Sequence, residues 1–149
     1  MSKKEEARRL HDEGFNCAQR TFCALCGETG HDRETALRIA SGFGAGMQQG
    51  EICGVVSAAV MALGLMFGHT NGRDAAAKAK MYALVRRFHE EFSVKRGSLL
   101  CREIAGCDPS TKEGAAFAKE HNVYATTCAG IIDDAIDIFE ELYQENCEG

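Results

Sequence analysis

A chain of 149 residues is long enough to form a hydrophobic core that is stable without disulfides. Its net charge of -5 argues against a basic surface for binding nucleic acid. One proline, no tryptophan and few β-branched runs favour helices over strands, so we expect one all-α domain spanning residues 1–149. The charged opening residues lack the apolar stretch that a secretory signal requires, which predicts a cytoplasmic protein.

Helix start and stop residues outline the first three predicted helices. The first covers residues 5–12 and ends near Gly14, after which Asn16 can cap a second helix over residues 17–25. Asp32 can cap a third helix, in which one apolar stripe is expected from Ala36, Ile39, Ala40 and Phe43.

The next segment, residues 41–50, is rich in glycine and must be a turn or a place where backbones approach closely. An anion-binding loop is the alternative. No strand precedes the segment, no Lys-Ser/Thr pair follows it, and its spacing fits neither nucleotide fingerprint, so we expect no bound nucleotide.

Residues 52–68 carry no charge and include many small side chains. This composition suits close helix contacts better than a lone membrane span, so we expect a buried central helix and no membrane insertion. The small residues would also permit close packing between two chains, so a homodimer is a further possibility.

Four further segments complete the predicted bundle. Residues 73–95 are expected to form a long amphipathic helix, and Ser98 to begin a short one. After a loop, Thr111 can begin another helix. The final helix begins near residue 126 and carries acidic side chains but no Lys or Arg, which offers a face to a basic redox partner or a solvated surface.

Four cysteines, called here the helix-start cysteines, fall in the first turn of predicted helices: Cys17, Cys53, Cys101 and Cys128. Unpaired N–H groups and the positive end of the helix dipole bias a thiol there toward thiolate, so at least one should have a pKa below about 8.5. If the helix starts converge, the sulfurs can hold an iron–sulfur cluster or another thiophilic metal, or form exchangeable disulfides. These residues are therefore our candidates for catalysis, cofactor binding and metal ligation.

The other four cysteines are weaker candidates. Cys23 and Cys26 form a C-x-x-C pair at the end of a predicted helix, where the dipole disfavours thiolate. Cys107 and Cys147 are interpreted as accessory. Two non-redox alternatives remain: a structural or interaction protein with buried or zinc-bound thiols, and a bundle whose glycine-rich turn binds an anion.

The cysteine segments resemble a family of redox-active proteins named for its C-GCAxxG-C-C pattern. The matching segments are Asn16-Cys17-Ala18-Gln19, Ser41-Gly-Phe-Gly-Ala-Gly46, Ile52-Cys53-Gly54, Cys101-Arg102-Glu103 and Cys128. In the central motif, Val55 and Ala58 replace the family's Ala and Gly, and both changes add bulk.

The resemblance implies a redox role for the same four cysteines, by metal or cluster ligation or by dithiol–disulfide cycling, in electron transfer or as part of an oxidoreductase. The family is also similar to part of the split-Soret cytochromes, which carry haem and an iron–sulfur centre. No Cys-x-x-Cys-His segment occurs in this chain, so we expect no covalent haem. Of the two groups in those cytochromes, the resemblance therefore implies only an iron–sulfur centre for this chain.

Overall fold

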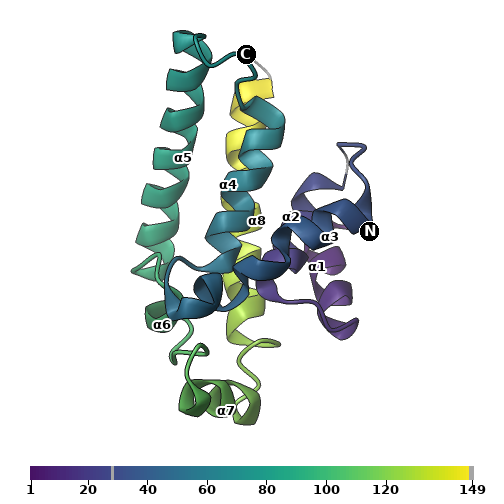
Figure 1. Ribbon diagram of the computed structural model, residues 1–149, viewed down its shortest axis with the longest axis vertical. Helices are drawn as coiled ribbons and strands as arrows, with labels where there is room; N and C mark the ends of the chain where they lie inside the picture. The colour runs from purple at the N-terminus through teal and green to yellow at the C-terminus, as the bar shows by residue number, and fades with distance from the viewer. Residues whose placement is uncertain (28, 148–149) are drawn as a thin grey trace.

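The computed structural model describes residues 1–27 and 29–147, and within these residues the chain is all-helical, as its composition predicts (Figure 1). One isolated antiparallel bridge joins Ile52 to Leu100. In chain order the helices are α1 (Lys3–Asp12), α2 (Cys17–Cys26), α3 (Arg33–Ala40), α4 (Gly54–Phe67), α5 (Ala75–Arg96), α6 (Cys101–Ile104), α7 (Lys112–Glu120) and α8 (Thr127–Cys147).

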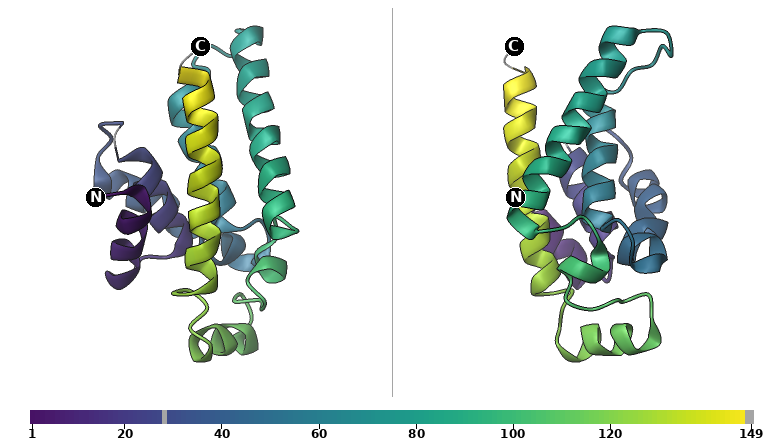
Figure 2. Two further views of the ribbon diagram at one scale, coloured as in Figure 1. Left: turned by 180° about the vertical axis from the view of Figure 1, so that it is seen from behind. Right: turned by 90° about the vertical axis from the view of Figure 1, so that its left-hand side faces the viewer.

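Helix α4 runs through the middle of the molecule and packs against α2, α5 and α8 (Figure 1). Helices α1 to α3 form one flank, while α6 and α7 lie at one end (Figures 1 and 2). Both α4 and α8 begin at the end where α6 and α7 lie. The positive ends of their dipoles therefore point toward one region of the fold.

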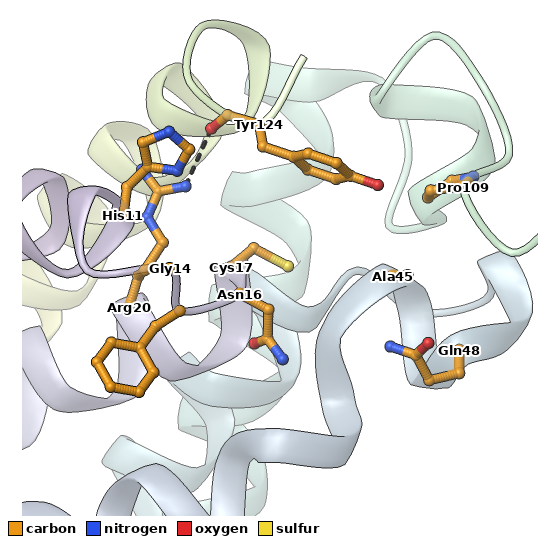
Figure 3. Close-up of a pocket in the computed structure, with 10 residues that line it drawn as sticks. His11, Gly14, Asn16, Cys17, Arg20, Ala45, Gln48, Pro109 and Tyr124 are labelled. Atoms are coloured by element: carbon orange, nitrogen blue, oxygen red, sulfur yellow. Dashed lines mark hydrogen bonds between the residues drawn. The ribbon is translucent and has the colours of Figure 1, made fainter. Parts of the chain in front are cut away.

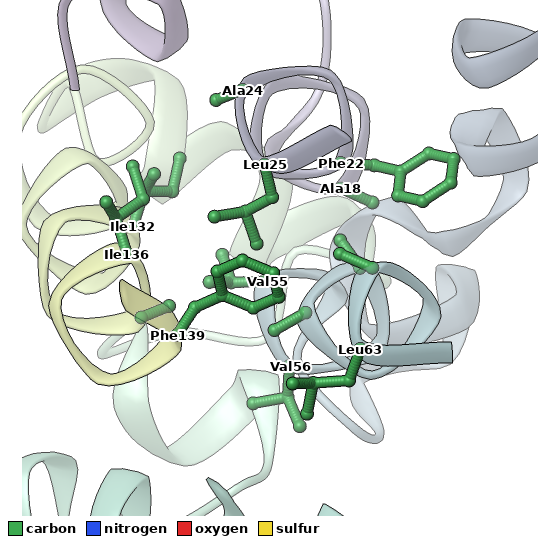
Figure 4. Close-up of a cluster of buried hydrophobic side chains, with 14 of the residues drawn as sticks. Ala18, Phe22, Ala24, Leu25, Val55, Val56, Leu63, Ile132, Ile136 and Phe139 are labelled. Atoms are coloured by element: carbon green, nitrogen blue, oxygen red, sulfur yellow. The ribbon is translucent and has the colours of Figure 1, made fainter. Parts of the chain in front are cut away.

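The core explains why α4 is uncharged. Its Val55 lies beside Leu25 of α2 and Phe139 of α8, whereas Val56 and Leu63 are buried on the side of α4 that is turned away from α2 (Figure 4). Burying each such side chain stabilises the fold by about 1.5–3 kcal/mol. The predicted buried central helix is thus confirmed, and no helix among the described residues is long and apolar enough to cross a membrane.

Side-chain caps fix where several helices begin. The Asn16 side chain accepts from the Gln19 N–H at the start of α2, and the Gln19 side chain accepts from the Asn16 N–H in return. Asp32 and Thr111 cap α3 and α7 as expected, and Asp74 caps α5. The start of α2, and with it the position of Cys17, is therefore encoded locally.

Two details of the sequence prediction are wrong. Ile39 is 53 % exposed, because the face of α3 that meets the core carries Ala36, Leu37 and Ala40 instead. Helix α6 begins at Cys101 rather than near Ser98, because the Ser98 hydroxyl accepts from the Leu100 N–H within the preceding turn. The second correction places Cys101 at the first position of its helix.

Candidate functional site

The segments that lead into α4 and α6 are tied together by their backbones. The Cys53 N–H donates to the Leu99 carbonyl at 2.8 Å, and the Cys101 N–H donates to the Glu51 carbonyl at 2.7 Å. Arg102 strengthens the junction through a 3.0 Å ion pair with Glu51. These contacts bring together two cysteines that are 48 positions apart in the sequence, since 101 minus 53 is 48.

Cys17 reaches the same place because α2 and α4 pack unusually closely. A Cβ added to Gly54 would lie 3.1 Å from the Cys17 sulfur and 2.6 Å from the Phe43 carbonyl oxygen. Real Cβ atoms are not found so near a carbonyl oxygen, so a glycine is required next to Cys53. The Gly54 position lets the Cys17 sulfur lie directly against the start of α4.

Cys128 comes from the start of α8, and its position is set by the loop that precedes this helix. Its N–H donates to the Val123 carbonyl at 2.9 Å. Arg20 of α2 crosses to this loop and donates from Nη1 to the Tyr124 carbonyl at 3.0 Å. Helices α2 and α8 are thus linked beside Cys128.

All four helix-start cysteines line one cavity of about 20 Å³, which we call the cysteine cavity. Apolar side chains, including Val55, Ile104 and Ile131, form much of its wall. Cys53 belongs to the main core, whereas Cys101 and Cys128 belong to a smaller cluster under α6 and α7. The cavity therefore lies where the two clusters meet, and it excludes bulk water.

Cys107 is a fifth thiol of this cavity, although its place beside a predicted turn indicated only an accessory role. It lies between α6 and α7, and it is close enough to Cys101 and Cys128 to affect the pKa values of their thiols. No motif marks Cys107 in the sequence. Its nearness to Cys101, followed by the turn at Asp108, is the only local signal that could have suggested it.

The remaining cysteines lie elsewhere. Cys23 and Cys26 are buried in the main core at the end of α2 and do not line the cysteine cavity. Cys147 is exposed near the end of α8. Burial raises the pKa of Cys23 to about 11, and this thiol lacks any helix start that would oppose the shift.

The expectation of an acidic helix-start thiol is wrong for the metal-free protein. Burial raises the pKa of all four, and the charges of neighbouring thiolates raise those of Cys53, Cys101 and Cys128 further. The pKa reaches about 12 for both Cys101 and Cys128. A helix dipole contributes only about 0.3–1 kcal/mol, less than one pKa unit, so desolvation outweighs it.

Several groups oppose this desolvation and would stabilise thiolates. The backbone N–H groups of Val55 and Val56 lower the pKa of Cys53, and that of Ala45 lowers the pKa of Cys17. The Arg20 guanidinium also acts on Cys17 and Cys128 in this direction. The cavity is therefore preorganised for negative charge that burial alone disfavours.

We predict that the metal-free protein loses stability as the pH rises from about 9 toward 12. An unfolded thiol releases its proton near pH 8.5, whereas burial holds the pKa of Cys128 at about 12. Between these values the folded state binds more protons, so stability falls by up to about 1.4 kcal/mol per pH unit for each such thiol. Below about pH 8.5 both states are protonated and the contribution is constant.

Denaturant unfolding of the wild type and of Cys128→Ala over this pH range measures the effect. The advantage of the wild type over the variant should shrink as the pH rises, because only the wild type carries the buried thiol. Parallel pH profiles for the two proteins would contradict the raised pKa of Cys128.

A left-handed turn closes one side of the cavity. Ala45, Met47 and Gln48 have φ values of 54, 61 and 59°, which cost about 1–2 kcal/mol each for residues other than glycine. Gly46 also has a positive φ, and a Cβ on it would lie 2.8 Å from the Cys101 Cβ. The glycine-rich segment is thus a close approach of backbones, one of the two interpretations that its composition allowed.

A second hollow, which we call the outer pocket, adjoins the cysteine cavity and opens to solvent. It has a volume of about 340 Å³ and shares Cys17, Ala45, Pro109 and Tyr124 with the cavity. Figure 3 shows the Cys17 sulfur directed between Tyr124 and Ala45. Cys17 is therefore the helix-start cysteine that faces both spaces.

Thiolates are soft ligands, so the donor chemistry of the cavity suits thiophilic metals. A tetrahedral zinc site needs all its sulfurs at about 2.3 Å from one point. In the part of the chain that the structure describes, no three His, Cys, Asp or Glu side chains are gathered in that way. A single ion and a polynuclear cluster would therefore both require the cysteine side chains to move from the arrangement seen here.

Comparison with known proteins gives one match. A family model described as "Putative redox-active protein (C_GCAxxG_C_C)" matches residues 15–142. No curated protein and no solved structure matches the chain. The matched range includes every cysteine that lines the cavity and leaves out Cys147.

Proposed function

The chain belongs to the C_GCAxxG_C_C family of redox-active proteins, and from that premise we propose that its four helix-start cysteines hold the redox centre. The observation that carries this proposal is the convergence of Cys17, Cys53, Cys101 and Cys128, from four different helices, on one cavity that excludes water. Cys23 and Cys26, the C-x-x-C pair buried in the main core, do not line this cavity and have no part in the proposed centre.

An iron–sulfur cluster is the centre that the site supports best. Four thiolates are the usual ligands of such clusters, and a bound cluster would supply one-electron redox chemistry. The apolar wall limits solvent access, which is one determinant of cluster potential. The cavity of about 20 Å³ has room for little more than one water molecule, so a cluster would have to displace its walls toward the adjoining outer pocket.

The protein groups around the cavity have definable roles in this proposal. The N–H groups of Val55 and Val56 favour a thiolate at Cys53, and the Arg20 guanidinium offsets negative charge at Cys17 and Cys128. Because the free thiols are protonated at neutral pH, loading the site must release protons, so its affinity should rise with pH.

Thiol–disulfide cycling is the competing mechanism for the same residues. The thiolate is the attacking species in exchange, and the raised pKa of Cys101 and Cys128 leaves little thiolate near pH 7. Cavity walls also keep bulky disulfides away from Cys53, which is only 5 % exposed. These features favour ligation over exchange.

Anaerobic purification followed by an absorption spectrum and by iron, sulfide and zinc analysis tests the proposal. We expect iron and acid-labile sulfide in equal amounts, with visible absorption that bleaches on reduction by dithionite. Zinc in place of iron would overturn the redox role. If the protein instead contains no metal and two helix-start thiols form a reversible disulfide, the cluster proposal is wrong and the redox role stands.

A protein redox partner is less well supported by the acidic surface than the sequence suggested. Three acidic side chains of α8 pair with α1, through Lys3–Glu140, Lys4–Asp137 and Arg8–Asp133, and two pair with α5, through Arg96–Asp134 and Arg87–Glu145. Much of the negative charge of α8 is therefore neutralised within the molecule. Access to the centre is better sought at the outer pocket.

A further inference from the structure

The outer pocket has an unbalanced positive charge. Arg20, which lines it, is only 2 % exposed, and it donates hydrogen bonds to the backbone carbonyls of Ala7 and Tyr124. Among the described residues, no carboxylate forms an ion pair with its guanidinium, and the negative groups that would act on it from farther away are Asp12 and the thiolates of Cys17 and Cys128. In the metal-free protein the thiols of Cys17 and Cys128 are protonated, so this buried charge has no paired counter-ion there, which favours an anion nearby.

The composition of the pocket wall agrees with this charge. Its lining includes His11, Asn16, Gln48 and Tyr124, which carry polar groups able to donate hydrogen bonds, and it includes no Asp or Glu. The chain as a whole has 22 acidic and 17 basic residues, so a pocket without a carboxylate departs from the average surface. A volume of about 340 Å³ is within the range of small-molecule sites.

We propose that the outer pocket binds a small organic anion, bearing a carboxylate, sulfonate or phosphate group, and holds it against Cys17. Arg20 supplies the positive potential, His11 offers a ring N–H as a hydrogen-bond donor, and the ring of Tyr124 supplies an apolar wall for the rest of the ligand. This inference deepens the proposed function, on which its redox meaning rests: the pocket would bring a small anionic redox partner to the most accessible cysteine of the centre.

Alkylation of Cys17 tests the charge preference of the pocket without knowledge of the ligand. Reduced, metal-free, full-length protein is treated with iodoacetate, which is an anion, or with iodoacetamide, which is neutral, and labelling is followed peptide by peptide. Both reagents attack the same thiolate, so the ratio of their rates does not depend on the thiol pKa. Cys147, exposed on the acidic helix α8, is the internal reference.

The rate ratio of iodoacetate to iodoacetamide should be about tenfold higher at Cys17 than at Cys147, because a cleft of one charge concentrates the opposite ion by at least this factor. Arg20→Gln should abolish the difference. Because Arg20 is buried and its loss could unfold the protein, His11→Glu provides a second test at a half-buried site without a side-chain hydrogen bond. It should reverse the preference, whereas His11→Gln should largely retain it.

Equal ratios at Cys17 and Cys147, or a Cys17 ratio that His11→Glu leaves unchanged in folded protein, would overturn the anion site. The same labelling on anaerobically purified protein separates this failure from failure of the redox centre. If Cys17 is protected until metal is removed and then shows no anion preference, the centre stands and the pocket proposal fails. If Cys17 reacts equally before and after metal removal and prefers iodoacetate, the pocket stands and the centre fails.

Discussion

Replacing Cys53 with serine should remove the iron and the visible absorption of the anaerobically purified protein while leaving the fold intact. Cys53 occupies the N-cap of α4, a position at which serine is among the preferred residues. The variant therefore loses a thiolate without losing a helix cap. Since loss of a second-shell partner alone weakens metal affinity by roughly 10–100-fold, loss of a ligand should weaken it by at least that factor, and the purified variant should retain little iron.

The matched control is the double substitution Cys23→Ala and Cys26→Ala. Both thiols are buried in the main core, outside the cysteine cavity, so their loss should cost stability but not iron. Iron content per folded protein and the circular dichroism of each variant decide the result. Equal loss of iron in the control and in Cys53→Ser would show that the wrong thiols were assigned to the centre.

The position of Cys17 was predictable because the start of its helix is encoded by neighbouring residues, whereas the starts of α4 and α6 have no side-chain cap. Asn16 caps α2 through its own side chain, so the position of Cys17 follows from four adjacent residues. Convergence was not predictable in this way. It depends on the backbone pairing of residues 51–53 with residues 99–101, which no local pattern in either segment specifies.

The chemistry of the site was harder to predict than its location. The sequence places Cys128 near a helix start and favours thiolate, but burial is a property of the folded chain and raises its pKa to about 12. Arg20 shows the same limit. In sequence it is one of 17 basic residues, and only the packing of α1 and the loop before α8 around it makes it a buried charge beside the cavity.

The left-handed turn was predictable only in part. Glycine at positions 44, 46 and 50 indicates a tight turn, yet Ala45, Met47 and Gln48 also adopt positive φ, which their side chains disfavour. Such strain is retained only where the surrounding structure fixes it, and it is concentrated at functional sites. Here Ala45 of the strained turn lines the cysteine cavity together with Cys17 and Cys101.

Gly54→Ala should destabilise the protein and displace Cys17 from the cavity, although alanine is ordinarily the better helix residue. Its Cβ would lie 2.6 Å from the Phe43 carbonyl oxygen and 3.1 Å from both the Ala18 Cβ and the Cys17 sulfur. A backbone oxygen cannot rotate away as a side chain can, so the turn that carries Phe43 must move away from α4, and α2 must shift to relieve the contacts with Ala18 and Cys17. Overpacking of this kind costs about 1–3 kcal/mol, and more where backbone has to move.

Gly64→Ala in the same helix is the matched control, because its Cβ would make only an ordinary 3.7 Å contact with the Met81 Cε. That variant should gain up to about 1 kcal/mol from helix propensity, so urea unfolding should separate the two variants by about 2–4 kcal/mol. Iron content should fall in Gly54→Ala and remain in Gly64→Ala, since only the first moves a proposed ligand. If Gly54→Ala proves as stable and as rich in iron as Gly64→Ala, the close approach of α2 to α4 is not what positions Cys17.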